Sequence, residues 1–210
     1  MSPSSGPVRV AVLDYKMSNL HSATKALERL GAEVVVVDGP TELDVDAVVL
    51  PGVGNFGQAS TRMHDQGLDE VVASAIQTGL PLLGICMGMQ LFFEESEESP
   101  GIRGLGVLAG SVKRIPTDLK LPSIGWRTVR WADEPTRDDA YYFVHSYACV
   151  PDDPEIVTGT AHHGVDHCAA IRSGLVTGVQ FHPEKSSRAG LALLGRWLAG
   201  VQATARVGIA

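Results

Sequence analysis

Apolar residues in the first half of the chain come in short continuous runs, separated by segments in which they recur every three or four positions. Continuous runs rich in Val, Ile and Leu are typical of strands buried on both faces of a parallel sheet. The three-to-four-residue period predicts helices between those strands. The predicted strands are 8–15, 33–38, 45–52 and 81–85, and the predicted helical segments are 18–31, 55–78 and 87–95.

The second half has a different pattern, with several short apolar runs and few helical segments between them. Such runs predict hairpins that extend the sheet in antiparallel fashion. They cover 107–115, 125–131, 140–150, 155–163, 167–173 and 175–184. A closing helix is predicted over 187–200, with an inner face formed by Leu191, Leu194, Trp197 and Leu198.

Together the two halves predict an α/β fold of the flavodoxin-like kind. We expect a three-layer sandwich around a mostly parallel, mixed sheet, with an antiparallel extension in the second half. The expected organisation is a disordered tail over 1–7, one domain over 8–200 and a C-terminal tail over 201–210. Within it, Ser18 is a candidate N-cap of the first helix and Gly31 a candidate stop signal.

Composition narrows the function classes. The chain has 210 residues and a formal net charge of −7, and it contains no basic block, so nucleic-acid binding is not expected. No apolar run reaches the ~18 residues that would span a membrane, and the N-terminus lacks a signal-peptide core. The three cysteines are odd in number and form no C-x-x-C pair. That pattern argues against disulfides or a zinc cluster and favours the cytoplasm.

One cysteine has a conspicuous setting, because Gly84-Ile85-Cys86-Met87-Gly88 has the form G-x-C-x-G between a predicted strand and a predicted helix. This is the thiol version of the nucleophile elbow, in which a sharp turn lifts the side chain out of the sheet. The helix N-terminus favours the thiolate, and the Met87 N–H is placed to stabilise an oxyanion. The alternative is that Cys86 is a small buried apolar residue. Cys149 and Cys168 lie in predicted strands and are interpreted as packing residues.

A nucleophilic thiol needs a base, and the base needs a group that orients it. In "TGVQFHPEKS", His182 ends a predicted strand and Glu184 follows two residues later, with Pro183 fixing the backbone between them. Glu184 can then hold one ring nitrogen while the other faces Cys86. This predicts acyl transfer from an amide or ester through a thioester; the alternative is a surface ion pair in a loop.

With these residues established, the chain resembles the class I (triad) glutamine amidotransferases over about residues 8–200. It is most similar to the glutaminase subunits of imidazole glycerol phosphate synthases, from histidine biosynthesis. The segments that carry the resemblance are "PGVGNFG" at 51–57, "GICMGMQLFFEESEE" from Gly84, "GLGVLAGSVKRI" from Gly104, "YYFVHSY" at 141–147 and "FHPEKS" at 181–186.

The resemblance implies a catalytic triad of Cys86, His182 and Glu184 and an oxyanion hole formed by Val53 and Met87, with the 51–54 strand reorienting before the Val53 N–H can take part. Glycines beside Val53 permit such a rotation. The implied substrate-binding residues are Gly52, Gly54, Gln90, His145, Ser146 and Tyr147, and the implied partner-interface residues are Asn19, Trp126, Tyr142 and Lys185. Without the resemblance, Gln90 would be interpreted as a solvent-facing helix residue, Trp126 as a core residue and Lys185 as a solvated charge.

The implied reaction is hydrolysis of L-glutamine to glutamate and ammonia, with no cofactor and no metal. The implied partner is a (β/α)8-barrel cyclase subunit, bound as a heterodimer, which receives the ammonia and holds a phosphorylated nucleotide. Three alternatives stay open: a paralogous subunit that supplies another synthase, a free-standing thiol hydrolase, and a catalytically idle scaffold subunit.

Two segments depart from the family pattern. The family usually has P-H-M-G-W-N where this chain has Pro122-Ser123-Ile124-Gly125-Trp126-Arg127, so serine replaces histidine and arginine replaces asparagine. The early loop "DYKMSNL" carries Lys16 and Met17 in place of the usual glycine spacing. Both segments face the partner in the family, so they bear on the partner rather than on the triad.

The segment "AHHGVDHC" suggests a metal site, since it contains His162, His163, His167 and Cys168. Alternation along a strand would place His162 and His163 on opposite faces and leave too few ligands on either one. We therefore interpret the segment as a hairpin that turns at Gly164.

Overall fold

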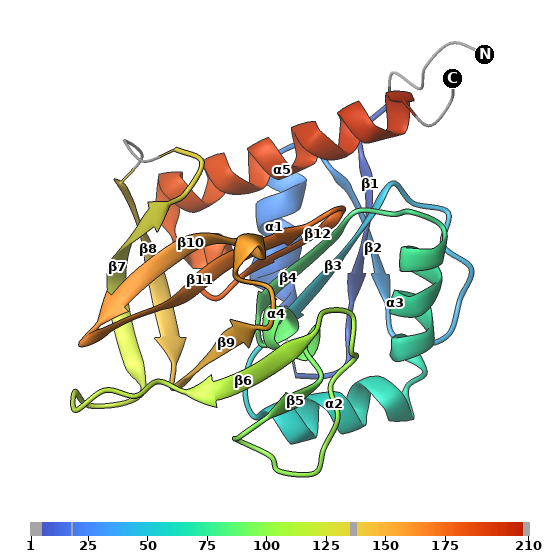
Figure 1. Cartoon of the computed structure of the whole chain (residues 1–210). Coiled ribbons are helices and arrows are strands. Elements are labelled where there is room, and N and C mark those ends of the chain that lie inside the picture. The colour runs from blue at the N-terminus through green and yellow to red at the C-terminus, as the bar shows by residue number, and fades with distance from the viewer. Residues whose placement is uncertain (1–5, 18, 135–137, 208–210) are drawn as a thin grey trace.

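The computed structural model describes residues 6–17, 19–134 and 138–207. A nine-stranded sheet runs through the molecule in the order β2-β1-β3-β4-β12-β11-β10-β7-β8 (Figure 1). Its strands are β1 (Arg9–Leu13), β2 (Glu33–Val37), β3 (Ala47–Gly52), β4 (Leu82–Cys86), β7 (Ser123–Trp131), β8 (Asp138–His145), β10 (Val157–His163), β11 (Val165–Ser173) and β12 (Val176–Val179). A smaller sheet contains β5 (Glu95–Ser96), β6 (Gly110–Arg114) and β9 (Tyr147–Pro151).

The large sheet has two halves that differ in strand direction. Strands β2, β1, β3, β4 and β12 run parallel, whereas β11, β10, β7 and β8 are antiparallel to their neighbours. The predicted mixed sheet with an antiparallel extension is therefore confirmed. Two runs assigned to that extension differ: 175–184 contains β12, which runs parallel to β4, and 107–115 contains β6 of the smaller sheet. The last strand, β12, joins the halves, because it pairs with β4 on one side and with β11 on the other.

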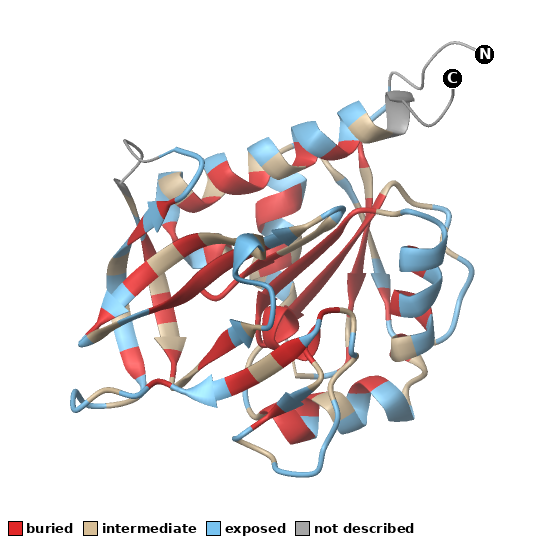
Figure 2. Cartoon of the chain, in the orientation of Figure 1, coloured by how far each residue is buried: buried red, intermediate tan, exposed pale blue. Residues whose placement is uncertain are grey.

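Helices cover both faces of the sheet. They are α1 (Leu20–Arg29), α2 (Phe56–Asp65), α3 (Leu68–Gln77), α4 (Met87–Leu91) and α5 (Ser187–Val207), with single 3-10 turns η1 (Pro154–Ile156) and η2 (Pro183–Lys185). One apolar core joins α1 and α5 to the sheet, and a second core joins α2, α3 and α4 to its other face. Figure 2 shows the central strands buried and the outward sides of the helices exposed, as expected for a three-layer sandwich.

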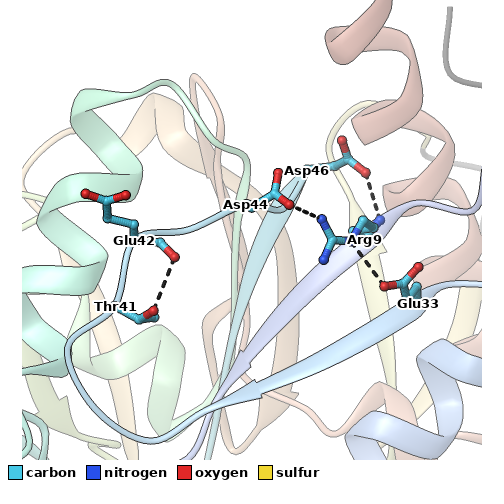
Figure 3. Close-up of polar contacts among 6 residues, drawn as sticks. All are labelled: Arg9, Glu33, Thr41, Glu42, Asp44 and Asp46. Carbon is cyan, nitrogen blue, oxygen red and sulfur yellow. Dashed lines mark hydrogen bonds and ion pairs between the residues drawn. The ribbon is translucent and has the colours of Figure 1, made fainter.

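Ion pairs tie together the amino ends of the parallel strands, at the edge of the sheet away from Cys86. Arg9 at the start of β1 contacts Glu33 on β2 and Asp44 before β3, and its backbone N–H donates to Asp46 at 2.7 Å (Figure 3). The partners Glu33 and Asp44 are exposed, so solvent screens these pairs and they add little to stability. Their main effect is to fix which strand ends lie together.

Two predicted elements end differently in the structure. The helix after Cys86 stops at Leu91 rather than near Glu95. The carbonyls of Leu91, Phe92 and Phe93 accept hydrogen bonds from the 105–108 loop, so they cannot continue a helix. The predicted strand 140–150 is split at Ser146 into β8 of the large sheet and β9 of the small one.

The ends of other elements also differ from expectation. The predicted 55–78 segment contains two helices, because Gly67 between them adopts the left-handed conformation. Helix α5 continues to Val207 and so enters the stretch assigned to a tail, while its inner residues Leu194 and Leu198 are buried as predicted. Ser18 and the outer parts of both tails lie outside the described residues. Within the described chain, no helix is both long enough and apolar enough to cross a membrane.

Candidate active site

Cys86 is the last residue of β4 and directly precedes α4, as the elbow prediction requires. Its backbone has φ 54° and ψ −106°, a conformation that non-glycine residues rarely adopt. Such backbone strain persists only where the surrounding packing enforces it, and it concentrates at functional sites. The strand–turn–helix geometry predicted for Gly84–Gly88 is therefore confirmed.

The glycines flanking Cys86 allow this close approach. A Cβ on Gly88 would lie 1.8 Å from the carbonyl oxygen of Leu50 on β3, and a Cβ on Gly84 would lie 2.7 Å from the backbone nitrogen of Met89. Both contacts are with rigid backbone, so neither position tolerates a side chain. The two glycines thus let α4 pack directly against β3 and β4 behind the thiol.

His182 and Glu184 form a buried pair near the carboxyl end of β12. His182 Nδ1 lies 2.8 Å from Glu184 Oε1, and the two side chains are 1% and 2% exposed. Figure 1 shows that β12 lies directly beside β4 in the sheet, which brings the pair close to Cys86 at the end of β4. The alternative of a surface ion pair is therefore excluded.

Cys86 and Glu184 control the charge of His182. Burial alone lowers the pKa of its ring, but the sulfur of Cys86 and the carboxylate of Glu184 outweigh burial and raise the pKa to about 10. The Nε2 atom makes no conventional hydrogen bond, although the sulfur is near enough to act on the ring electrostatically. His182 is therefore an imidazolium at neutral pH, between the sulfur of Cys86 and the carboxylate of Glu184.

A cavity of about 270 Å³ opens at this point. It is large enough for a small polar metabolite and lies where the carboxyl ends of parallel strands meet, the usual ligand site of open α/β sheets. Its walls are Val53, Gly54, Cys86, Met87, Gln90, Glu98, Pro122, Val144, His145, Ser146, Tyr147 and His182. Of the substrate-binding residues expected from the sequence, Gly52 is the one that does not line it.

Gln90 is buried, so it is not a solvent-facing residue. Its Nε2 donates to the carbonyl of Tyr147 at 3.1 Å and to Oε1 of Gln180 at 3.0 Å. The two hydrogens of that amide are therefore both used, and only Oε1 can face a ligand. The network fixes the direction in which Gln90 presents its oxygen.

The sequence analysis missed Gln180. This residue is fully buried, and its Nε2 lies 3.6 Å from the sulfur of Cys86 while its Oε1 accepts from Gln90. It therefore links the thiol to the cavity wall. A signal was available, because Gln180 ends an apolar run two residues before His182, and alternation puts both side chains on one side.

Glu98 was also missed, since the sequence analysis gave it no role. It lines the cavity, and its Oε2 accepts from the Phe56 N–H at 2.7 Å. This bond fixes the carboxylate at the N-terminus of α2. No pattern in the sequence separates Glu98 from its exposed acidic neighbours.

The Val53 N–H, an expected oxyanion donor, is directed elsewhere. It donates to the carbonyl of Met17 at 3.0 Å, in the loop that departs from the family pattern. Gly54 follows with φ +99°, a conformation that favours glycine. The donor is therefore occupied in this structure, and the peptide must rotate before it can face the cavity.

His145 lies in the cavity wall but is unsuited to proton transfer near neutral pH. Burial outweighs the hydrogen bond that the ring donates to the backbone carbonyl of Tyr147, and it lowers the pKa of His145 to about 3. Its Nδ1 lies 2.9 Å from that carbonyl, so the ring braces the turn at Ser146. This geometry favours the structural interpretation of His145.

Cys149 and Cys168 are buried away from the cavity, as predicted for packing residues. Burial raises the pKa of both thiols, that of Cys168 to about 12, so neither is an effective nucleophile. Among the three cysteines, Cys86 alone combines a strained backbone with a place in the cavity wall.

Three of the four expected interface residues lie together beside His182. Trp126 and Tyr142 face each other across β7 and β8, with ring centroids 6.2 Å apart, and the carbonyl of Tyr142 accepts from the His182 N–H. Lys185 is exposed on the adjoining η2 turn, and α1, which Asn19 caps, contacts the same turn. Trp126 is 52% exposed, so it is not a core residue.

The two departures at 123 and 127 contact each other. The Nε of Arg127 donates to Oγ of Ser123 at 2.6 Å, and Ser123 pairs with His145 across β7 and β8. The serine side chain, which is shorter than the histidine usual in the family, therefore accepts a hydrogen bond from Arg127, four residues further along β7. The contact lies within β7, at the end of the strand that pairs with His145.

The histidine-rich segment forms the predicted hairpin, in which Gly164 turns between β10 and β11 with φ +76°. His162 is exposed and bonded to Asp166, whereas His163 is buried and lies 3.1 Å from the carbonyl of Lys120. The adjacent histidines thus lie on opposite faces, as alternation predicts.

Comparison with known proteins supports the geometry. Residues 11–198 match the model of the family described as "Glutamine amidotransferase class-I". The chain is 46% identical over 199 residues to a protein of Methanopyrus kandleri named imidazole glycerol phosphate synthase subunit HisH, covering 92% of this chain and 98% of that protein. It is also 46% identical over 193 residues to the protein of the same name from Moorella thermoacetica, covering 88% and 91%.

The fold agrees with these matches. A solved structure described as a glutamine amidotransferase superposes with a TM-score of 0.73 at 25% identity, covering 91% of this chain and 98% of that one. The matched region contains the elbow, the His182–Glu184 pair and the strands that bring them together. From its sequence and its architecture alike, the chain belongs to the class I glutamine amidotransferase family.

Proposed function

We propose that this chain is the glutaminase subunit of imidazole glycerol phosphate synthase, and that it hydrolyses L-glutamine and passes the ammonia to a cyclase subunit in histidine biosynthesis. The observation that carries the proposal is the strained thiol of Cys86 beside the buried His182–Glu184 pair. Identity of 46% to subunits of that name over nearly the whole chain supports the pathway.

In the first half of the reaction, Cys86 attacks the side-chain amide carbon of glutamine as a thiolate, its thiol proton having passed to Nε2 of His182. The C–S bond forms as the carbonyl π bond becomes an oxyanion. His182, held protonated by its neighbours, then gives its Nε2 proton to the departing nitrogen, and the C–N bond breaks to release ammonia. A γ-glutamyl thioester on Cys86 remains.

In the second half, water attacks the thioester. His182, now neutral, accepts a proton from the water, and the C–S bond breaks to give glutamate and free Cys86. Glu184 keeps the Nδ1 side of the ring occupied throughout, so Nε2 is always the atom that exchanges protons. The role of Glu184 is therefore to fix the orientation and charge of the ring.

The oxyanion hole requires two donors. The Met87 N–H lies at the first position of α4, where a helix leaves its N–H groups without intrahelical partners. The Val53 N–H can become the second donor only after it leaves the Met17 carbonyl. This requirement accounts for a glutaminase that is slow until its partner triggers the rearrangement.

Glutamine would be held by groups at both of its ends. Gln90 offers its Oε1, and Glu98 places a carboxylate where an α-ammonium group could bind. The turn at His145, Ser146 and Tyr147 supplies main-chain groups, and Gly54 lines the cavity beside the thiol.

A partner would dock over Trp126, Tyr142 and Lys185. Ile124 and Trp126, which are 57% and 52% exposed, present apolar surface on the same face of β7. Large exposed side chains of this kind mark binding surfaces. We propose a (β/α)8-barrel cyclase here as a heterodimer partner, and a cytoplasmic location, which three unpaired cysteines favour.

The test is release of glutamate from L-glutamine by the purified chain, with and without the cyclase subunit and its nucleotide substrate. We expect strong stimulation that disappears in Cys86→Ala. Activity that depends on Cys86 but ignores this cyclase would leave the glutaminase chemistry standing and reject the pathway. Absence of activity under every condition would favour the idle scaffold subunit.

A further inference from the structure

Tyr15 carries a buried hydroxyl that the mechanism above does not use. The residue follows β1 and is fully buried, and its hydroxyl has no hydrogen-bond partner. A buried polar group without a partner is uncommon in native structures and calls for an explanation. Burial, and then the nearby charge of Cys86, raises the pKa of this phenol, so it stays protonated and can donate.

The hydroxyl lies against Gly52, the last residue of β3. A Cβ built on Gly52 would lie 1.9 Å from the phenol oxygen, so that oxygen occupies the space where a side chain would begin. Gly52 is paired with Cys86 in the sheet register. The unpartnered donor is therefore at the point where the expected oxyanion strand passes the nucleophile.

Rotation of the Gly52–Val53 peptide would create a matching need. In this structure the Val53 N–H donates to the Met17 carbonyl. If that peptide turns, the N–H leaves the Met17 carbonyl and faces the cavity. The Gly52 carbonyl oxygen then points away from the cavity, to the side where the N–H was. Met17 presents only an acceptor there, so the rotated carbonyl needs a different donor.

We propose that the Tyr15 hydroxyl is this donor, and that it holds the Gly52–Val53 peptide in the orientation in which the Val53 N–H faces the oxyanion. This inference rests on the proposed glutaminase function and adds a positioning residue to it. Tyr15 touches neither the substrate nor the sulfur. It acts through the backbone of residues 52 and 53.

The Tyr15 hydroxyl then destabilises one orientation of the Gly52–Val53 peptide and stabilises the other. With the peptide as seen here, the hydroxyl is buried without a partner, which destabilises this state. With the peptide rotated, the hydroxyl and the Gly52 carbonyl satisfy each other. Removing one oxygen atom should therefore change stability and catalysis in opposite directions.

The experiment compares Tyr15→Phe with Tyr141→Phe. Tyr141 is equally buried, but its hydroxyl has a partner, Asp139 Oδ2 at 3.2 Å, and it lies outside the cavity wall. For each variant we would measure kcat and KM for glutamine with the cyclase subunit and its substrate present, the melting temperature of the isolated chain, and the rate of Cys86 alkylation.

For Tyr15→Phe we expect kcat to fall about 5–10-fold, the effect of losing one hydrogen bond in the catalytic state. The KM and the alkylation rate should barely change, and the melting temperature should stay the same or rise. For Tyr141→Phe we expect the melting temperature to fall while kcat is retained.

An unchanged kcat in Tyr15→Phe would overturn the inference, and so would a fall in kcat that accompanies a lower melting temperature. Wild-type turnover that Cys86→Ala abolishes tests the proposed function separately. If the wild type had no such turnover, the glutaminase proposal would fail, and this inference, which depends on it, would fail with it.

Discussion

The ends of β3 and β4 lie side by side at the cavity, yet they are held in very different ways. The end of β4 is a strained turn fixed by backbone packing at Gly84 and Gly88. Beyond the pairing of Gly52 with Cys86, the chain leaving β3 is held by a hydrogen bond from the Val53 N–H to the Met17 carbonyl. Under the proposed function, the nucleophile is thus built in advance, whereas one donor of its oxyanion hole is still to be placed.

The difference shows how an enzyme can keep a reactive thiol and still be slow. Changing the elbow would require α4 to move away from two strands, whereas changing the β3 end requires one peptide to rotate. A hydrogen bond contributes about 1 kcal/mol net, and rotation at glycine meets little steric resistance. A docked partner can supply energy on that scale, so control belongs at β3.

The largest expected effect concerns Cys86, at the end of β4. Cys86→Ala should lower glutamate release by at least about 10⁴-fold, since loss of a nucleophile removes the covalent route. Cys149→Ala is the matched control, because it deletes a buried thiol that lies off the cavity. That variant should keep its activity and lose some thermal stability. Equal losses from both variants would mean that Cys86 is a packing residue.

The next prediction tests whether the elbow is as rigid as proposed. Gly88→Ala should destabilise the protein by about 3 kcal/mol, because its Cβ would overlap the Leu50 carbonyl. For a chain of this size the melting temperature should fall by about 6–12 °C in calorimetry. Gly39→Ala is the control, since nothing lies within 4 Å of a Cβ there. If Gly88→Ala left the melting temperature unchanged, the end of β4 would be no more rigid than the end of β3.

Gln180→Leu should have a smaller effect that sharpens the comparison. It removes the donor near the sulfur of Cys86 and the acceptor that orients Gln90, while it fills the same buried space. We expect kcat to fall roughly 10-fold and KM to rise, in steady-state assays with the partner present. Leucine at the exposed Gln77 should change neither. A drop in KM would show that Gln180 does not position Gln90.

The last prediction concerns pH. The pKa of His182 is raised from an ordinary 6.5 to about 10, so its imidazolium adds stability that is fully present below pH 6.5 and lost as the pH rises through 10. The difference in melting temperature between the wild type and His182→Asn should therefore shrink across this window. A difference that is constant with pH would argue against a charged pair at the elbow.

The parts of the site that could be predicted are those encoded locally. The elbow depends on five consecutive residues, and the His182–Glu184 pair on three, so each pattern carries its own geometry. The four strands of the first half also follow from short apolar runs, and the helices between them follow from the helical period. These features needed no knowledge of which distant residues would meet.

The parts that could not be predicted depend on contacts between distant segments. Nothing in the 14–17 loop indicates that Met17 would bind the Val53 N–H, or that Tyr15 would lie against Gly52. The helix after Cys86 ends early because residues 105–108 take its carbonyls, a competition that periodicity does not contain. In the same way, the split of 140–150 depends on β6, which pairs with β9.

The place of β12 in the sheet has a consequence for how the protein is made. This strand is the last to be synthesised, yet it lies between β4 and β11 and carries His182 at its end. A growing chain can fold its first four strands and the elbow while the base is still missing. Under the proposed mechanism the thiol gains its proton partner only when the sheet closes, so a chain that ends before β12 should not hydrolyse glutamine.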